Sequence, residues 1–288
     1  MANAREIRRR IRSVRNMSQI TRAMEMVSAA KMRRAQQRVL ASRAYSERLE
    51  AVIGDLASLS LDSEQLKAFP LLEQRTVKKA GLILITPDRG LTGALNSNVI
   101  RRGARYITAE AGVPVEVLAV GKKGRDFMVR TRQEVAAEFI GLGDKVTLDE
   151  TRPIADVATQ DFVSGKVDSV TVVFADFVNT LVQKPEARQI LPIVKPQESG
   201  TYTDYIFEPS PEAVLAALLP RYIEVQIYQA MLESIASEHS ARMVAMRAAT
   251  DNAKELVTDL TLHYNKARQA QITREVSEIA AGANALGR

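Results

Sequence analysis

Residues 218–267 decide the fold, and their sequence is LLPRYIEVQIYQAMLESIASEHSARMVAMRAATDNAKELVTDLTLHYNKA. Alternating steps of four and three residues reach fifteen positions in it, and only Gln229, His239 and Thr250 among them are neither apolar nor aromatic. This spacing, sustained over seven heptads, is typical of a coiled-coil helix. The stripe consists of Leu218, Tyr222, Val225, Gln229, Leu232, Ala236, His239, Met243, Met246, Thr250, Ala253, Val257, Leu260, Tyr264 and Ala267.

Proline and glycine are concentrated in the middle of the chain. All ten prolines lie from Pro70 to Pro220, and eleven of the fourteen glycines lie from Gly81 to Gly200. Because proline breaks helix interiors and glycine weakens them, a long helix is predicted at each end, and the start of the second is marked by Pro209, Ser210 and Pro211 before Glu212. A helix of about 65 residues would be about 100 Å long. Two such helices pair most simply antiparallel, and they need a surrounding protein to cover them.

The N-terminal helix is predicted from about Ala2 to Leu59. Its first apolar stripe is expected at Ile7, Ile11, Val14, Met17, Ile20, Met24 and Val27. From Met32 the steps of four and three become regular, through Ala35, Val39, Ser42, Ser46, Leu49, Ile53 and Leu56. The small residues in this second part allow two helices to approach closely, and they bind each other less strongly than Leu or Ile would.

The middle of the chain has the pattern of an α/β domain. Short runs rich in β-branched residues predict strands at Ala80–Thr86, Val115–Val120 and Val170–Phe174, with an edge strand at Arg188–Val194 that contains Pro192. Helix-compatible stretches lie at Leu95–Ala111, Gly124–Phe139 and Ile154–Gly165. Alternation of strands and helices predicts a Rossmann-like, mainly parallel sheet. The fold class is therefore α/β plus a long antiparallel coiled coil, with domains at 1–69, 70–208 and 209–288.

Composition excludes several kinds of site. The chain has no cysteine and only two histidines, His239 and His263, so thiolate metal sites, disulfides and histidine-rich metal centres are excluded. No metal or cofactor is expected, and no apolar run is long enough to cross a membrane. The net charge is +6, but residues 1–50 alone carry +9. This basic arm favours an acidic partner: nucleic acid, a membrane surface or a negatively charged protein.

Two segments of the chain allow a second interpretation, which their sequence patterns disfavour. Ala2–Ser18 is rich in Arg and poor in acids, like a mitochondrial transit peptide, but the helical pattern continues far beyond any cleavage point, so mature structure is favoured. Thr86–Gly93 follows a predicted strand, where α/β folds often bind phosphate. Its glycines, Gly90 and Gly93, do not have the spacing of a dinucleotide or P-loop motif, so a tight turn is predicted.

The candidate carboxylates and histidines form no catalytic set. No spacing singles out a pair of carboxylates, and a solvated surface is expected for them. Both histidines lie in the C-terminal helix, and His239 is predicted to make a polar contact between the two helices. The carboxylates considered are Asp88, Asp126, Asp144, Asp149 and Glu150.

Several motifs together closely resemble the gamma-subunit family of F-type ATP synthases, over essentially the whole chain. At position 92 this chain has Thr where many members of that family have Cys. The motifs are those at 4–8, 20–27 and 30–32, Asp88–Asn96, Asp204–Pro209, Glu238–Ala253, Tyr264–Gln269 and Ile272–Ala283.

The resemblance implies a non-catalytic rotor subunit of the central stalk, of the bacterial type without the chloroplast regulatory insertion. It would couple proton flow through a membrane proteolipid ring to conformational cycling of an alpha–beta catalytic hexamer. The implied partners are the alpha and beta subunits, with one gamma per three alpha–beta pairs, the epsilon subunit and the ring, but no nucleic acid. The chain would be a peripheral membrane protein, held through these partners at the cytoplasmic face of the bacterial plasma membrane.

The resemblance also implies contact residues, none of them catalytic. Rotor–beta contacts are expected at Met24, Arg242, Gln269, Thr273 and Glu275, and foot contacts with epsilon and the ring at Tyr205 and Glu208. Two other classes of protein stay open from the residues alone. One is a basic coiled-coil protein that binds nucleic acid, and the other is an α/β enzyme with a coiled-coil appendage.

Overall fold

The computed structural model describes residues 4–59, 69–194 and 208–286. The chain forms two compact units, one of Met1–Ser28 with Met243–Arg288 and one of Ala29–Arg242. Helix α1 (Ala4–Leu59) and helix α6 (Pro211–Leu286) contribute to both units. The two long terminal helices predicted from the sequence are confirmed.

In the smaller unit the two helices run antiparallel. Thr21 Oγ1 lies 2.7 Å from Thr250 Oγ1, and the Glu25 carboxylate lies 3.5 Å from the Arg247 guanidinium. Residue numbers therefore decrease along α6 in the direction in which they increase along α1. If this register continues one residue for one residue toward the N-terminus, Ala4 lies opposite Ala267. The described α6 side chains from residue 268 to 283 are all exposed, because α1 offers them no partner.

The larger unit continues the antiparallel pairing and adds the α/β domain. Arg43 of α1 lies 3.4 Å from Glu233 of α6, and Gln226 donates a 3.4 Å hydrogen bond to Ser46. The C-terminal stripe predicted from the sequence is buried over most of its length. Its buried members are Val225, Gln229, Leu232, Ala236, His239, Met246, Thr250 and Ala253.

The stripe predicted for the first turns of α1 is partly wrong. Met17, Ile20 and Val27 are each more than half exposed, whereas Thr21 and Ser28 are buried. The regular steps from Met32 to Leu56 continue backward through these smaller residues to Ile11 and Ile7, which are buried as expected. Small hydroxyl side chains let the helices approach closely, and the hydroxyls of Thr21 and Thr250 are hydrogen-bonded to each other across the pair. The larger apolar residues are left on the outer surface.

Prolines occur inside two helices of the structure. Pro220 lies in the third turn of α6, and Pro153 lies near the start of α5 (Leu148–Val163). A proline removes one backbone donor from a helix. Because Pro220 is exposed, water can reach the carbonyl that it leaves unpaired, and the helix continues through it.

A five-stranded sheet forms the core of the α/β domain. The strands are β1 (Ala80–Ile85), β2 (Val115–Val120), β3 (Glu134–Phe139), β4 (Ser169–Phe177) and β5 (Gln183–Leu191). Their order is β3-β2-β1-β4-β5, with the first four parallel and β5 antiparallel to β4 at the edge. The expected mainly parallel sheet is confirmed, and Pro192 follows the edge strand instead of lying inside it.

One predicted element is wrong. The stretch Gly124–Phe139 was expected to be a helix, but it contains the end of α4 (Lys122–Arg130) and then strand β3. Strand β3 has the sequence EVAAEF, with alternating exposed and half-buried side chains. It lies at the edge of the sheet, where one polar face meets solvent, so it lacks the apolar run that marks the buried strands.

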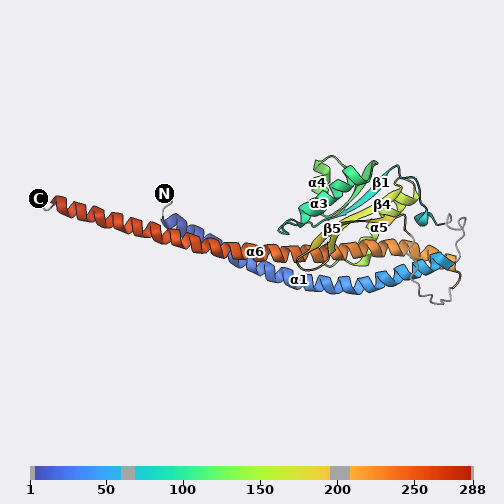
Figure 1. The fold of residues 1–288 in the computed structure, drawn as a ribbon, viewed down its shortest axis with the longest axis horizontal. Helices are drawn as coiled ribbons and strands as arrows, with labels where there is room; N and C mark the ends of the chain where they lie inside the picture. Colours follow the sequence, from blue (N-terminus) through green and yellow to red (C-terminus); the bar gives the residue numbers. More distant parts are fainter. Residues whose placement is uncertain (1–3, 60–68, 195–207, 287–288) are drawn as a thin grey trace. The chain divides into compact units, whose positions relative to one another are not determined.

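Helices cover both faces of the sheet (Figure 1). On one face lie α4 and α3 (Leu95–Arg105), which continues as a π-helical turn over Tyr106–Glu110. On the other face lie α5 and α6, and a short 3₁₀ turn, η1 (Pro70–Leu72), precedes β1. The largest fully buried side chains of the domain include Phe162, Phe174, Leu82, Met128 and Ile154. The sheet therefore sits between two layers of helix, and α6 belongs to both the domain and the coiled coil.

Candidate functional site

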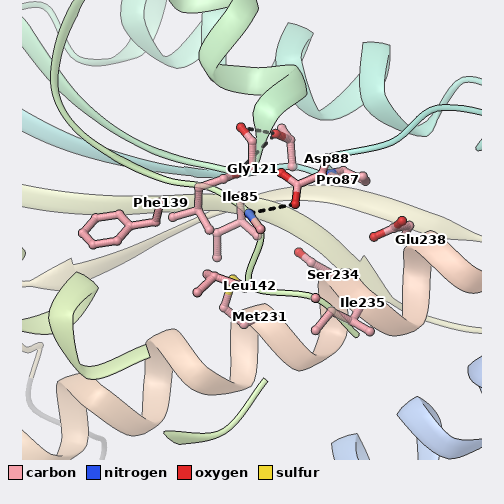
Figure 2. Close-up of a pocket in the computed structure, with 14 residues that line it drawn as sticks. Ile85, Pro87, Asp88, Gly121, Phe139, Leu142, Met231, Ser234, Ile235 and Glu238 are labelled. Carbon is pink, nitrogen blue, oxygen red and sulfur yellow. Dashed lines mark hydrogen bonds between the residues drawn. The ribbon is translucent and has the colours of Figure 1, made fainter. Parts of the chain in front are cut away.

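The start of α4, which follows β2, is held by a carboxylate of the chain. Asp88 Oδ2 accepts a 3.0 Å hydrogen bond from Gly141 N (Figure 2), and its Oδ1 accepts one of 2.8 Å from Lys122 N. Helix N-termini attract anions because their first N–H groups have no partner in the helix. The Asp88 carboxylate therefore occupies the N-terminus of α4.

Close contact between two loops removes the remaining room. Gly121 has φ +89°, and a Cβ atom built on it would lie only 1.7 Å from the Thr86 carbonyl oxygen. Side chains of α6, among them Met231, Ser234 and Glu238, close the crevice from the side of that helix (Figure 2). The cavity that is left has a volume of about 50 Å³, far less than a nucleotide needs.

A second group of polar residues joins α1, α6 and the loop after β3. Asp144 lies in that loop, and its Oδ2 accepts a 2.5 Å hydrogen bond from Lys31 Nζ of α1. Its Oδ1 lies 3.2 Å from His239 Nε2 of α6, at a geometry that falls short of a hydrogen bond. Its backbone carbonyl accepts a 3.2 Å bond from Arg38, also of α1.

Arg242 extends the same group to the loop after β1. Its guanidinium donates to Glu238 Oε1 at 2.5 Å and to the Gly90 carbonyl at 3.3 Å. Its third contact is with His239 Nδ1 at 3.4 Å. We refer to Lys31, Arg38, Gly90, Asp144, Glu238, His239 and Arg242 together as the neck junction.

The charges of the neck junction fix its protonation. Burial lowers the pKa of His239 to about 4, and the cations Arg242 and Lys31 act in the same direction against the opposing effect of Asp144. Burial raises the pKa of Asp144, but Lys31, His239 and Arg242 together hold that pKa below its ordinary value. Burial also raises the pKa of the Glu238 carboxyl, although Arg242 opposes this. At neutral pH His239 is uncharged and Asp144 is ionised.

Sequence reasoning missed this group. Asp88 and Asp144 were expected to be solvated surface carboxylates, but both are held by contacts within the chain. His239 is buried as its place in the stripe predicts, but its polar contacts are with Asp144 and Arg242 and not with a side chain of α1. The loops that carry Asp88 and Asp144 are distant in sequence, so no spacing could have brought them together.

The residues proposed as rotor–beta contacts lie in different settings. Met24 is half-buried on α1, and Gln269, Thr273 and Glu275 are exposed on the last part of α6. The Arg242 side chain is only 12% exposed and bonds within the neck junction. The structure thus does not gather these five residues into one site.

The residues proposed as foot contacts can be placed only in part. Glu208 is exposed just before α6, and Tyr205 lies outside the described residues. The described part of the chain contains no cluster of His, Asp and Glu that could hold a metal ion. In the same residues no helix is both long and apolar enough to span a bilayer.

A basic surface runs along α1 beside the neck junction. A cavity of about 470 Å³ is lined there by Lys31, Arg34, Arg38 and Lys145 together with Asp144 and others. Arg9, Arg10 and Arg33 are exposed on the same helix. Exposed cations at this density favour an acidic protein surface as partner.

The chain is similar to known proteins over nearly its whole length. The model of the family described as ATP synthase matches residues 3–286. The ATP synthase gamma chain of Roseiflexus castenholzii is 59% identical over 290 residues, which cover 99% of each chain. That of Dehalococcoides mccartyi strain CBDB1 is 53% identical over 287 residues, covering 99% of this chain and 100% of the relative.

Solved structures show the same fold. The Euglena gracilis mitochondrial ATP synthase in an assembly of OSCP, F1 and c-ring contains a chain that matches with a TM-score of 0.71 and 20% identity, covering 98% of this chain and 94% of that one. A chain of the central stalk and c-ring of the Tetrahymena thermophila enzyme matches with a TM-score of 0.57 and 24% identity, over 80% of this chain and 99% of that one. At these identities the likeness concerns the fold alone.

Proposed function

This chain belongs to the ATP synthase gamma-chain family and is a non-catalytic subunit of that complex, and we propose that it works as the rotor of the central stalk. In this role it couples proton flow through a membrane ring to the conformational cycle of the alpha and beta subunits. The observation that carries the proposal is the end of α6, which extends beyond the first turn of α1 with every described side chain from residue 268 to 283 exposed. A helix of this kind needs a sleeve supplied by another protein.

The composition of that end suits a turning contact. Its apolar residues are few and spaced apart, and alanine and glycine occupy Ala280–Ala283. Numerous weak contacts allow rotation, whereas a deep apolar interface would hold one orientation. Gln269, Thr273 and Glu275 are accordingly proposed to meet the beta subunits in turn. Met24 is proposed to meet them from α1, and Arg242 through the small exposed part of its side chain.

The other assignments concern assembly and location. The α/β domain, with Tyr205 and Glu208, is proposed to rest on the epsilon subunit and the membrane ring. The division of the chain at 1–69, 70–208 and 209–288 follows from these roles. One copy is proposed to join three alpha–beta pairs, at the cytoplasmic face of the bacterial plasma membrane. The crevice beside Asp88 is too small for a nucleotide, which argues against the alternative of an α/β enzyme, and the relatives give no support to nucleic-acid binding.

The experiment reverses exposed charges of α1 in the reconstituted complex. Arg9, Arg10, Arg33 and Arg34 are changed together to Glu, and ATP-driven proton pumping into vesicles is measured. We expect pumping or assembly to be impaired, because these cations face acidic segments of the surrounding subunits. The matched control changes Lys78, Lys122, Lys123 and Lys184, four exposed lysines of the α/β domain, to Glu. Unchanged pumping by the α1 variant would refute the proposed contact.

A further inference from the structure

The coiled coil of the larger unit is weak in its middle. Ala35, Ser42 and Ser46 of α1 face α6 there, and such small side chains bury little apolar area. Helix α6 is anchored in the α/β domain by buried residues such as Ile223 and Ile227 and by the Ser237 bond to the Ala175 carbonyl. Helix α1 contacts α6 in this unit, through Arg43 with Glu233 and through Ser46 with Gln226. A force applied to the domain would therefore reach α6 directly and α1 only across a weak seam.

Asp144 provides a second route for that force. Its carboxylate accepts a hydrogen bond from Lys31, and its backbone carbonyl accepts one from Arg38. These two residues lie seven positions apart on one face of α1. On the other side its carboxylate faces His239 of α6. One loop residue of the α/β domain thus contacts both helices of the coiled coil.

The tautomer of His239 follows from its neighbours. Arg242 can only donate hydrogen bonds, so His239 Nδ1, 3.4 Å from it, must accept one and carries no proton. The proton of the neutral ring is then on Nε2, which faces the Asp144 carboxylate. Arg242 in turn bonds the Gly90 carbonyl in the loop after β1. The neck junction thereby forms a continuous polar path from two loops of the domain through α6 to α1.

We propose that Asp144 is a positioning residue that holds both helices of the coiled coil to the α/β domain, so that torque enters α1 and α6 together. The inference rests on the proposed rotor function. The Lys31 and Asp144 side chains are 39% and 41% exposed, and pairs this exposed contribute little to folding stability. We expect the pair to keep the two helices in position while torque acts on them. A variant that loses the charge of Lys31 or Asp144 should therefore still fold.

The test uses the complete complex in vesicles carrying Asp144→Asn. We expect ATP hydrolysis without a proton gradient to stay within about twofold of wild type, because little force then acts on the junction. ATP synthesis against a large gradient should fall about threefold or more. A role in folding or assembly would lower both rates in parallel. Lys31→Ala should reproduce the effect, and the exchanged pair Lys31→Asp with Asp144→Lys should restore synthesis.

Asp149→Asn is the matched control. Asp149 is five positions further along, its side chain is 81% exposed, and among the described residues it pairs with Arg152, three residues away. Both rates should be unchanged in this variant. An unchanged rate of synthesis in Asp144→Asn, or a parallel loss of synthesis and hydrolysis, would overturn the proposal.

A second measurement separates this inference from the rotor function itself. Hydrogen exchange of the backbone amides of residues 140–147 in the assembled complex should be faster in Asp144→Asn than in wild type. Unchanged exchange in Asp144→Asn would reject the proposed role of Asp144, whatever the rates of ATP synthesis and hydrolysis are. Conversely, wild-type complexes that hydrolyse ATP but move no protons would reject the rotor function, and faster exchange in the variant would still support Asp144 as the link between loop and helices.

Discussion

Replacing Gly121 with Ala tests the close crossing of the loops after β1 and β2. Gly121 has φ +89° and ψ 147°, a region of backbone conformation that L residues scarcely adopt. The added Cβ would lie 1.7 Å from the Thr86 carbonyl oxygen and 2.8 Å from its carbon. Neither distance is tolerated between unbonded atoms, so one of the two loops must move.

Thr86 has little freedom to move. Its backbone N donates a 2.8 Å hydrogen bond to Val120 O, and its Oγ1 accepts one of 2.8 Å from Gly124 N. The strained conformation costs about 1–3 kcal/mol. Losing one of these hydrogen bonds costs about 1 kcal/mol more. The Gly121→Ala variant should therefore lose about 3 kcal/mol of unfolding free energy, a large part of the total for an ordinary domain.

The assay is urea unfolding of the purified chain, followed by circular dichroism. Gly90→Ala is the matched control: it lies in the loop after β1, and a Cβ built on it meets no atom within 4 Å. The control should change the unfolding free energy by less than about 0.5 kcal/mol. If Gly121→Ala lost less than about 1 kcal/mol, the close approach of the two loops would be refuted.

Three further outcomes are expected. Thr250→Val alone should destabilise the chain by at most about 1 kcal/mol in urea unfolding, because Thr21 loses its 2.7 Å partner but keeps its bond to the Ser18 carbonyl. The double Val variant should recover part of that loss, since no hydroxyl then stays buried at this contact, and equal and additive losses would contradict this. Because the pKa of His239 is about 4 in the folded chain and near 6.5 when unfolded, the unfolded chain binds the extra proton, so stability should fall as pH drops from 6.5 to 4. In thermal melting at different pH values, His239→Gln should reduce the dependence of stability on pH, and His263→Gln should leave it as in wild type. An unchanged dependence in His239→Gln would exclude His239 as its source. Removing residues 268–288 should leave the urea midpoint of the chain unchanged, because the described side chains there are exposed; a lower midpoint would show contacts within the chain.

The sequence predicted the architecture well where the spacing of apolar residues stayed regular over a whole element. Of the positions that steps of four and three reach from Val225 to Ala253, all but Met243 are buried. Strands β1, β2 and β4 were visible because both of their faces are covered, which requires continuous apolar runs. The motif resemblance then led to the family, which the relatives confirm.

The errors share a physical cause. Where two helices pack very closely, or where a strand is partly exposed, apolar character does not predict which side chains are buried. The choice of Met17 and Ile20 for the α1 stripe followed size, whereas the helices approach closely enough to need Thr21 and Ser28. Strand β3 has alanines and glutamates that also suit a helix, and only pairing with β2 decides the matter. The neck junction depends on loops meeting in space, which no local pattern encodes.

The carboxylate of Asp88 at the start of α4 has a consequence for how the sheet edge is held. Asp88 follows β1, and its carboxylate accepts hydrogen bonds from Lys122 N after β2 and from Gly141 N after β3. One side chain therefore connects the segments that follow three neighbouring parallel strands. The chain makes this connection itself and needs no ligand for it.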